Sequence, residues 1–404
     1  MTDFLPEQYT PLVARVLRID DVTSGDAKSD FVVRYRGRLY SQDSEAAYDE
    51  LAAALHPLGI TPIFRLEDEK RAGGRHVICL RDGVAQIKPS NPRINVILLI
   101  VTTLSVILAG AIYAYDGPVS GDLWTDLRAS LQNIGPGISF AASMMAILLA
   151  HEFGHYLAGR YHKANVTLPY FIPFPLSPFG TLGAFIQMKD IPRNRRHLLD
   201  IAIAGPLAGV LVAIPVLLIG LSLSPVDALP GFVSQEQTSL SLEGNSILYL
   251  ALKWVAKGQL LPAPVVYDIP VPLYWLRYMF TGYPLPLGGK DVLLHPIAWA
   301  GWAGLLVTSL NLIPAGQLDG GHLLYVLMGK RAAKAVPFVL SAVFLLGFFW
   351  NGWWLWAILI FLFGRVYAEP LDLITPLDGR RKVLALIGLI VFVLVFIPVP
   401  LILV

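Results

Sequence analysis

The sequence predicts an α-helical polytopic membrane protein with about seven transmembrane helices and a small N-terminal α+β soluble domain. Of its 404 residues, 55% are hydrophobic and only 15% are charged. The mean hydropathy of +0.59 is far above that of ordinary soluble proteins. Apolar runs long enough to cross a bilayer recur after residue 90. The net charge of +2 is too small to indicate nucleic acid as a partner.

Residues 1–90 have the short alternating apolar segments of a soluble domain. The pattern predicts a β-β-α-β-β order in which Asp43 or Ser44 caps the helix. A single cysteine, Cys79, excludes an intrachain disulfide. No nucleotide loop or ligand cluster is present, so we expect a regulatory or docking module that could bind a cytosolic regulator. The predicted elements are strands Leu12–Ile19 and Phe31–Tyr35, helix Ser44–Leu55, and strands Ile60–Leu66 and His76–Leu80.

Residues 91–404 form the predicted transmembrane domain. After the first span we expect a short polar loop at 116–135. The long connection 222–290 should hold an interfacial helix at Asn245–Val255, followed by irregular Pro-rich chain. The seven predicted spans are Ile94–Tyr115, Ile138–Tyr161, Leu198–Leu221, Leu294–Ile313, Ala335–Phe349, Trp353–Val366 and Leu384–Leu403.

The distribution of Lys and Arg between the spans predicts the orientation. Positive charge gathers in the short flanks on one side, whereas the opposite loop 116–135 holds only Arg128. Because cytosolic loops carry the excess of basic residues, we expect the N-terminus in the cytosol and the C-terminus outside. The basic flanks contain Arg93, Arg160, Lys163, Arg193, Arg195, Arg196, Lys330, Arg331, Lys334, Arg380, Arg381 and Lys382, together with Lys88.

The second span ends in His151-Glu152-Phe153-Gly154-His155. Histidines four apart on a helix project from one face, which lets two ring nitrogens hold one zinc ion. Glu152 lies beside the first histidine and can take a proton from water at that metal. Ionisable groups cost several kcal/mol at membrane depth and therefore indicate function. The alternative is that the histidines only form hydrogen bonds in a polar helix interface.

A catalytic zinc needs one more protein ligand, and Asp319 is the best candidate. It follows the fourth predicted span, which returns the chain to about the level of the two histidines. Pro314 and Gly316 can bend the chain toward the metal. The alternative is that Asp319 only caps a short helix beginning at Gly320. His322 is a weaker ligand candidate.

Two segments between these motifs have unusual composition. Residues 162–196 are apolar but rich in proline, and Gly180–Ile186 is predicted to be extended. Such backbone is either covered by protein at membrane depth or forms a loop on the membrane surface. In the third span, the small residues of Gly205-Pro206-Leu-Ala208-Gly209 let another helix approach closely.

Together these motifs resemble the site-2 protease family of intramembrane zinc metalloproteases. The resemblance covers roughly residues 138–325. It rests on His151–His155, on Gly205-Pro206, and on Asn311-Leu-Ile-Pro314 leading to Leu318-Asp319-Gly320. The likeness is nearest to the bacterial and chloroplast branch without a PDZ insert, which includes the chloroplast EGY proteins. That branch matches through Gly180-Thr-Leu-Gly-Ala-Phe185 and Gly316-Gln-Leu-Asp-Gly-Gly321.

The resemblance implies a core built from the second, third and fourth spans and one zinc ion per chain. His151, His155 and Asp319 would be the metal ligands, Glu152 the general base, and Asn311 a residue that orients the substrate or the site. An unwound substrate would pair with the backbone of Gly180, Thr181, Leu182, Gly183, Ala184 and Phe185.

The expected function is hydrolysis of peptide bonds within or near the transmembrane segments of membrane proteins. The partners would be membrane-spanning protein substrates and the lipid bilayer. The expected location is a bacterial plasma (inner) membrane, crossed several times. Two alternatives remain open: an ion-coupled membrane transporter that uses the same polar residues, and an inactive protease-like scaffold.

Overall fold

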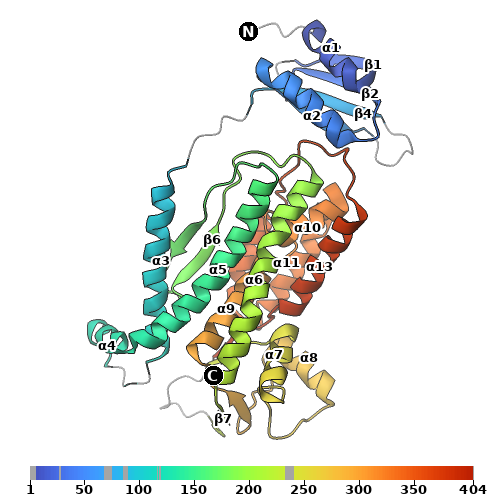
Figure 1. The fold of residues 1–404 in the computed structure, drawn as a ribbon. Helices are drawn as coiled ribbons and strands as arrows, with labels where there is room; N and C mark the ends of the chain where they lie inside the picture. Colours follow the sequence, from blue (N-terminus) through green and yellow to red (C-terminus); the bar gives the residue numbers. More distant parts are fainter. Residues whose placement is uncertain are drawn as a thin grey trace.

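The computed structural model describes residues 6–26, 29–67, 75–84, 90–115, 117, 120–232 and 241–403. A small unit with a β-sheet, residues 6–84, lies at one end of a larger helical body (Figure 1). We call residues 6–84 the N-terminal unit. Short 3₁₀ helices occur at His56–Leu58, Leu131–Asn133 and Gly329–Lys334.

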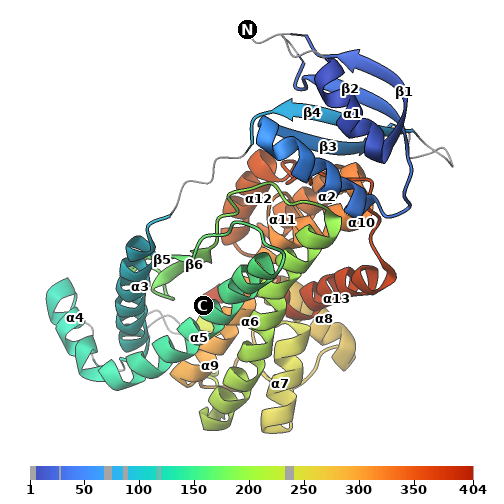
Figure 2. The ribbon, with the colours of Figure 1, turned by 45° about the horizontal axis from the view of Figure 1, so that its top comes forward.

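The N-terminal unit is a four-stranded antiparallel sheet with strand order β1-β2-β4-β3, packed against two helices (Figure 2). Its apolar core includes Tyr35, Leu51 and Phe64. The Asp43 carboxylate caps α2 by accepting a hydrogen bond from the Ala46 N–H. The elements are α1 (Pro6–Val16), β1 (Leu17–Ser24), β2 (Val33–Leu39), α2 (Ser44–Leu55), β3 (Ile60–Leu66) and β4 (His76–Asp82).

The structure corrects one strand of this unit. The predicted strand Leu12–Ile19 is wrong for its first five residues, which lie in α1, and the strand begins at Leu17. Tyr9, Val13 and Val16 are all buried. Their spacing of four and three residues is that of one helix face, and this stripe packs on the sheet. The predicted helix Ser44–Leu55 and strand Ile60–Leu66 are confirmed.

Three helices in the described part of the chain are long and apolar enough to cross a membrane. They are α3 (Pro92–Tyr113), α5 (Ile134–Tyr161) and α6 (Arg195–Leu223). The other predicted spans coincide with shorter helices, which do not by themselves establish seven crossings. These helices are α9 (Pro296–Asn311), α11 (Val336–Leu346), α12 (Gly352–Phe363) and α13 (Gly379–Val395).

The last predicted span, Leu384–Leu403, is wrong at its end. The helix stops at Val395, and Leu401–Leu403 forms strand β10, which pairs with β8 (Ser241–Glu243). Pro398 and Pro400 lack the N–H groups that would continue the helix, so the chain becomes extended. Hydrophobicity alone did not reveal this change.

A β-hairpin lies between α3 and α5 (Figure 1). Strand β5 (Tyr170–Pro173) pairs with β6 (Thr181–Phe185), so the predicted extended conformation of the Gly180 segment is confirmed. The Asn95 amide of α3 donates to the carbonyl of Leu168, and the Ser105 hydroxyl donates to that of Gly180. Ser105 lies in the middle of α3, so the hairpin packs alongside this candidate span.

The connecting regions contain more regular structure than predicted. The loop 116–135 includes helix α4 (Leu123–Ser130), while residues 116 and 118–119 lie outside the described part. A helix, α7 (Ile247–Lys257), occurs where an interfacial helix at Asn245–Val255 was predicted. The segment after it was expected to be irregular but forms α8 (Val271–Thr281), whose buried Tyr274, Trp275 and Tyr278 pack in one small apolar cluster. Strand β7 (Val226–Ala228) pairs with β9 (Lys290–Val292).

A buried ion cluster holds this region together. Lys253 is fully buried, and its ammonium donates to the Glu243 carboxylate at 2.7 Å and to the Leu261 carbonyl at 3.1 Å. Asp291 lies 3.8 Å from the same ammonium. The pKa of Asp291 is raised to about 7. Burial is the main cause and the nearby Glu243 carboxylate adds to it, while the Lys253 ammonium acts in the opposite direction. The cluster therefore contains one more carboxylate than cations.

This cluster predicts a pH-dependent stability. The pKa of an aspartate in the unfolded chain is about 3.9. Because the pKa of Asp291 in the folded chain is higher, the folded chain binds this proton more tightly than the unfolded chain does. Stability from this group is present below about pH 4 and is lost as the pH rises toward about 7. The thermal unfolding midpoint in detergent should therefore fall between pH 5 and pH 8, and fall less for Asp291→Asn. Equal falls in both proteins would contradict the assignment.

Candidate metal centre

His151 and His155 lie on adjacent turns of α5 and point into one buried space. Their Nε2 atoms are 3.2 Å apart. His151 is 4% exposed and His155 is 7% exposed. The spacing of four residues along a regular helix accounts for the shared direction of the two rings.

Asp319 reaches the two histidines from another part of the chain. After α9 ends at Asn311, the backbone turns through Gly316, which has a φ of +58°, and α10 (Asp319–Met328) begins. The Asp319 Oδ2 atom lies 3.5 Å from His151 Nε2 and 3.3 Å from His155 Nε2. The cap residue of α10 is Leu318, so Asp319 is not the helix cap.

The three donor atoms fit a zinc ion. Ligand atoms about 2.0–2.1 Å from a tetrahedral zinc are separated from each other by roughly 3.3 Å. The three observed separations lie between 3.2 and 3.5 Å. Within the described ranges, no other group of three His, Cys, Asp or Glu side chains converges in this way. Two imidazoles and one carboxylate are also a donor set that zinc prefers.

Helix α6 fixes the orientation of His155. The His155 Nδ1–H group donates to the carbonyl of Ile201 at 2.7 Å. A carbonyl can only accept, so Nδ1 carries the proton and the lone pair of Nε2 is free to bind a metal. Gly205 lies against the same ring: a Cβ atom there would be 2.1 Å from His155 Nε2.

Glu152 and Asn311 complete the polar groups around the histidines. Glu152 is 4% exposed, and its Oε2 atom has no hydrogen-bond partner among the described residues. A buried carboxylate oxygen without a partner is costly in a folded protein and indicates a function. The Asn311 Nδ2 atom lies 3.3 Å from His151 Nε2, so the amide stands at the edge of the metal-binding triad.

A cavity of about 570 Å³ connects these groups. Strand β6 supplies Ala184 and Phe185 to its wall, whereas Gly180 packs against α3 outside it. The strand pairs with β5 along one edge, and no strand of the described chain occupies its other edge. The side chains of Leu182 and Phe185 are 64% and 50% exposed. Thr181 and Gly183 lie in the same strand but do not line the cavity.

Comparison with known proteins identifies the family. The model of Peptidase family M50 matches residues 139–349, just over half of the chain and all of the residues just described. The chain belongs to peptidase family M50.

Curated relatives of this M50 chain include plant proteins named as probable chloroplastic zinc metalloproteases. Probable zinc metalloprotease EGY1, chloroplastic, of Arabidopsis thaliana is 32% identical over 68% of this chain and 45% of its own length. Probable zinc metalloprotease EGY2, chloroplastic, of Oryza sativa subsp. indica is 30% identical over 67% of this chain and 44% of its own. The chain therefore spans less than half the length of these relatives. No solved structure gave a significant match.

Several residues of this M50 site were not predicted from the sequence. The Ile201 carbonyl orients a ligand, but a backbone group has no residue-type signature. His322, the weaker ligand candidate of the sequence analysis, lines the cavity and is buried, but it is not one of the three converging donors. Other wall residues come from α6 (Leu198 and Ala202) and from the turn before α10 (Gln317 and Leu318). Two loops supply the rest: Gln187, Met188, Asp190, Ile191 and Pro192 in one, and Ala368 and Glu369 in the other.

Proposed function

We propose that this M50 chain is an intramembrane zinc metallopeptidase that cleaves peptide bonds within or near transmembrane segments of membrane proteins. The observation that carries the proposal is the convergence of His151, His155 and Asp319 beside a buried Glu152, whose Oε2 atom has no hydrogen-bond partner in the described part of the chain. These groups sit on or beside apolar helices, where ionisable side chains are retained for function.

Each polar residue has a proposed role. His151, His155 and Asp319 would hold zinc. When bound, the zinc ion would act as a Lewis acid that polarises a peptide carbonyl and lowers the pKa of a water molecule at the site toward about 7. Glu152 accepts the proton of the attacking water and returns it to the leaving amine. Asn311 orients the substrate or the site from beside His151.

The proposed substrate-binding element is the Gly180–Phe185 segment. A transmembrane substrate is a helix whose carbonyls are bonded internally, so it must unwind before attack. The free edge of β6 can offer replacement main-chain hydrogen bonds, as in strand addition to a sheet. Ala184 and Phe185 bring that edge to the cavity that contains the triad.

The proposed topology follows the sequence. Residues 1–90 form a cytosolic domain, and residues 91–404 form a transmembrane metalloprotease domain with its core at 138–325. The chain would cross a bacterial plasma membrane about seven times. The one-sided distribution of Lys and Arg supports this orientation, although the relatives named above are chloroplastic. Fusion of reporter enzymes to the predicted loops would test it.

Metal analysis provides the first test of the enzyme. Purified full-length chain should contain about one zinc per chain, and His155→Ala and Asp319→Ala should each lose it, because two remaining ligands bind zinc weakly. His56→Ala is the matched control, since His56 is exposed on the N-terminal unit. The same samples are assayed with a membrane-spanning reporter. Zinc that survives both ligand substitutions, or ion flux through liposomes in place of cleavage, would contradict the proposal.

A further inference from the structure

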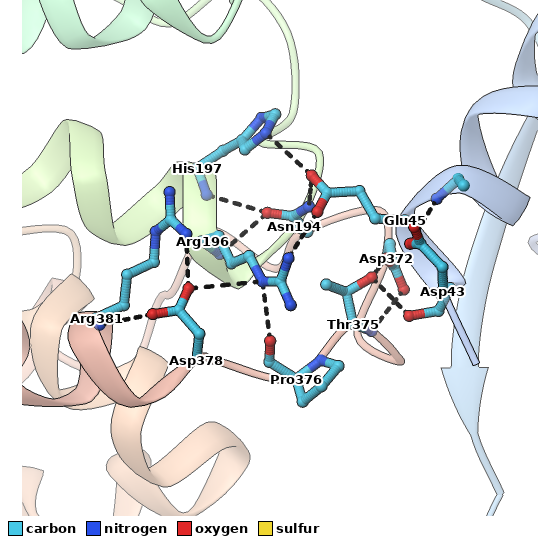
Figure 3. Close-up of polar contacts among 12 residues, drawn as sticks. Asp43, Glu45, Asn194, Arg196, His197, Asp372, Thr375, Pro376, Asp378 and Arg381 are labelled. Atoms are coloured by element: carbon cyan, nitrogen blue, oxygen red, sulfur yellow. Dashed lines mark hydrogen bonds and ion pairs between the residues drawn. The ribbon is translucent and has the colours of Figure 1, made fainter.

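The N-terminal unit docks on the helical body through the first turn of α2 (Figure 3). The Glu45 carboxylate accepts hydrogen bonds from Arg196 Nη1 at 2.8 Å and from Asn194 Nδ2 at 3.0 Å. His197 Nε2 lies 3.5 Å from the same carboxylate. One acidic side chain thus contacts three residues at the start of α6. Arg193 adds an ion pair to Asp49 and a hydrogen bond to the Glu45 carbonyl.

A second attachment is made by the backbone. The extended segment 371–373 lies between β3 of the N-terminal unit and residues 192–194 of the helical body, pairing in parallel with both. It thereby links β3 to the helical body through main-chain hydrogen bonds. The hydrogen bonds run from Phe64 N to Leu371 O (2.9 Å), Leu373 N to Phe64 O (3.1 Å), Leu371 N to Pro192 O (3.0 Å) and Asp372 N to Arg193 O (2.7 Å).

Buried polar contacts hold this segment in shape. Asp372 is fully buried, and its carboxylate accepts hydrogen bonds from the backbone N–H groups of Ile374 and Thr375 and from the Thr375 hydroxyl. The Thr375 hydroxyl is also 2.9 Å from that of Ser44, the residue beside Glu45. The two attachments therefore meet at the start of α2 (Figure 3).

The docked segments continue directly into the walls of the cavity. Ile191 and Pro192 line the cavity, and Pro192 is itself the first of the paired residues 192–194. Ala368 and Glu369 line the cavity just before residues 371–373. The Arg65 guanidinium of the N-terminal unit donates to the carbonyls of Pro370 and Leu371 at 3.0 and 2.8 Å. The docked unit thus contacts the loop 368–373 directly, and it contacts the residues that immediately follow the loop 187–192.

We propose that Glu45 is a positioning residue for substrate binding: by docking the N-terminal unit, it holds the loops 187–192 and 368–373 in the arrangement that receives the substrate. The inference rests on the proposed peptidase function. The metal ligands themselves lie on α5 and α10, and the Ile201 carbonyl that orients His155 lies one helical turn beyond His197, the last α6 residue near Glu45. Glu45 lies outside the apolar core of the N-terminal unit, so its replacement leaves that core intact.

The test compares Glu45→Arg in the full-length chain with Glu50→Arg. Glu50 lies on the same helix and is exposed, so the control carries the same charge change away from the contact. For Glu45→Arg we expect the KM for a membrane-spanning reporter to rise about five- to tenfold, with kcat within about twofold. The zinc content should remain about one per chain. Glu50→Arg should match the unsubstituted chain in all three measurements.

A cross-link separates loss of docking from other damage. In a Cys79→Ser background, which removes the one natural cysteine, Ser44→Cys with Thr375→Cys places two thiols across the interface. Mild oxidation of this pair should restore the KM of Glu45→Arg, and reduction should raise it again. Failure of the cross-linked protein to recover would overturn the inference.

The remaining outcomes are also decisive. An unchanged KM in Glu45→Arg, with the unsubstituted chain cleaving normally, would overturn this inference alone. Faster cleavage by Glu45→Arg would overturn it and would mean that the docked N-terminal unit inhibits the enzyme. Loss of zinc from Glu45→Arg would also overturn it, because the contact would then support the metal centre instead. An unsubstituted chain that binds zinc but cleaves nothing would overturn the proposed function and this inference with it.

Discussion

Glu152→Gln should abolish cleavage of a membrane-spanning reporter while zinc remains bound. Glutamine has nearly the same shape as glutamate but cannot accept the proton of the attacking water. Glu152 is not one of the three converging donors, so its replacement leaves the ligand set complete. Loss of a general base costs typically about 10²–10⁴-fold in rate, which would put the residual activity below detection in a gel assay.

The measurement pairs reporter cleavage with zinc content in the same preparation. Glu50→Gln is the control, because it makes the same chemical change on an exposed surface of the N-terminal unit. Undiminished cleavage by Glu152→Gln would remove the residue from the mechanism. Loss of zinc would instead mean that the carboxylate takes part in holding the metal.

Gly205→Ala should sharply lower zinc affinity and activity without changing any polar residue. A methyl group at this position would lie 2.1 Å from His155 Nε2 and within 2.5 Å of two ring carbons. The ring cannot easily retreat, since its Nδ1 atom is held by the Ile201 carbonyl and the side chain is buried. Disturbing the groups that orient a ligand typically lowers metal affinity about 10–100-fold.

Gly209→Ala gives a graded comparison on the same helix. There the new methyl group would lie 3.2 Å from His151 Nδ1, so a shift of a few tenths of an ångström relieves the contact. Zinc affinity, measured by competition with a chelator, should fall sharply for Gly205→Ala and only slightly for Gly209→Ala. Equal affinities in the two variants would mean that α5 and α6 can separate at little cost.

The paired histidines were predictable because their relation is local. Four residues along a helix always return to the same face, so the spacing of His151 and His155 determines the direction of both rings. Asp319 was predictable from the direction and length of the span before it, and the structure brings it within 3.5 Å of both histidines. The small residues around Gly205 were also correctly interpreted as a close helix contact.

The errors occurred where local patterns were ambiguous. Tyr9, Val13 and Val16 fit a helix, but the segment that follows them alternates, and the strand was extended too far toward the N-terminus. At the other end, Leu384–Leu403 is apolar throughout, yet its last residues pair with β8, a partner about 160 positions earlier. Hydrophobicity reports burial, but it does not report which partner supplies the hydrogen bonds.

The sequence by itself determined the family, the two histidines with their neighbouring glutamate, and the apolar spans, because these depend on residue type at short separations. Only the tertiary structure decided which carbonyl orients His155, which loops enclose the cavity, and where the N-terminal unit rests. Those features depend on backbone hydrogen bonds and ion pairs between distant segments, such as Leu371 with Pro192 and Glu45 with Arg196. Every residue offers the same backbone groups, so such pairings become visible only once the chain has folded.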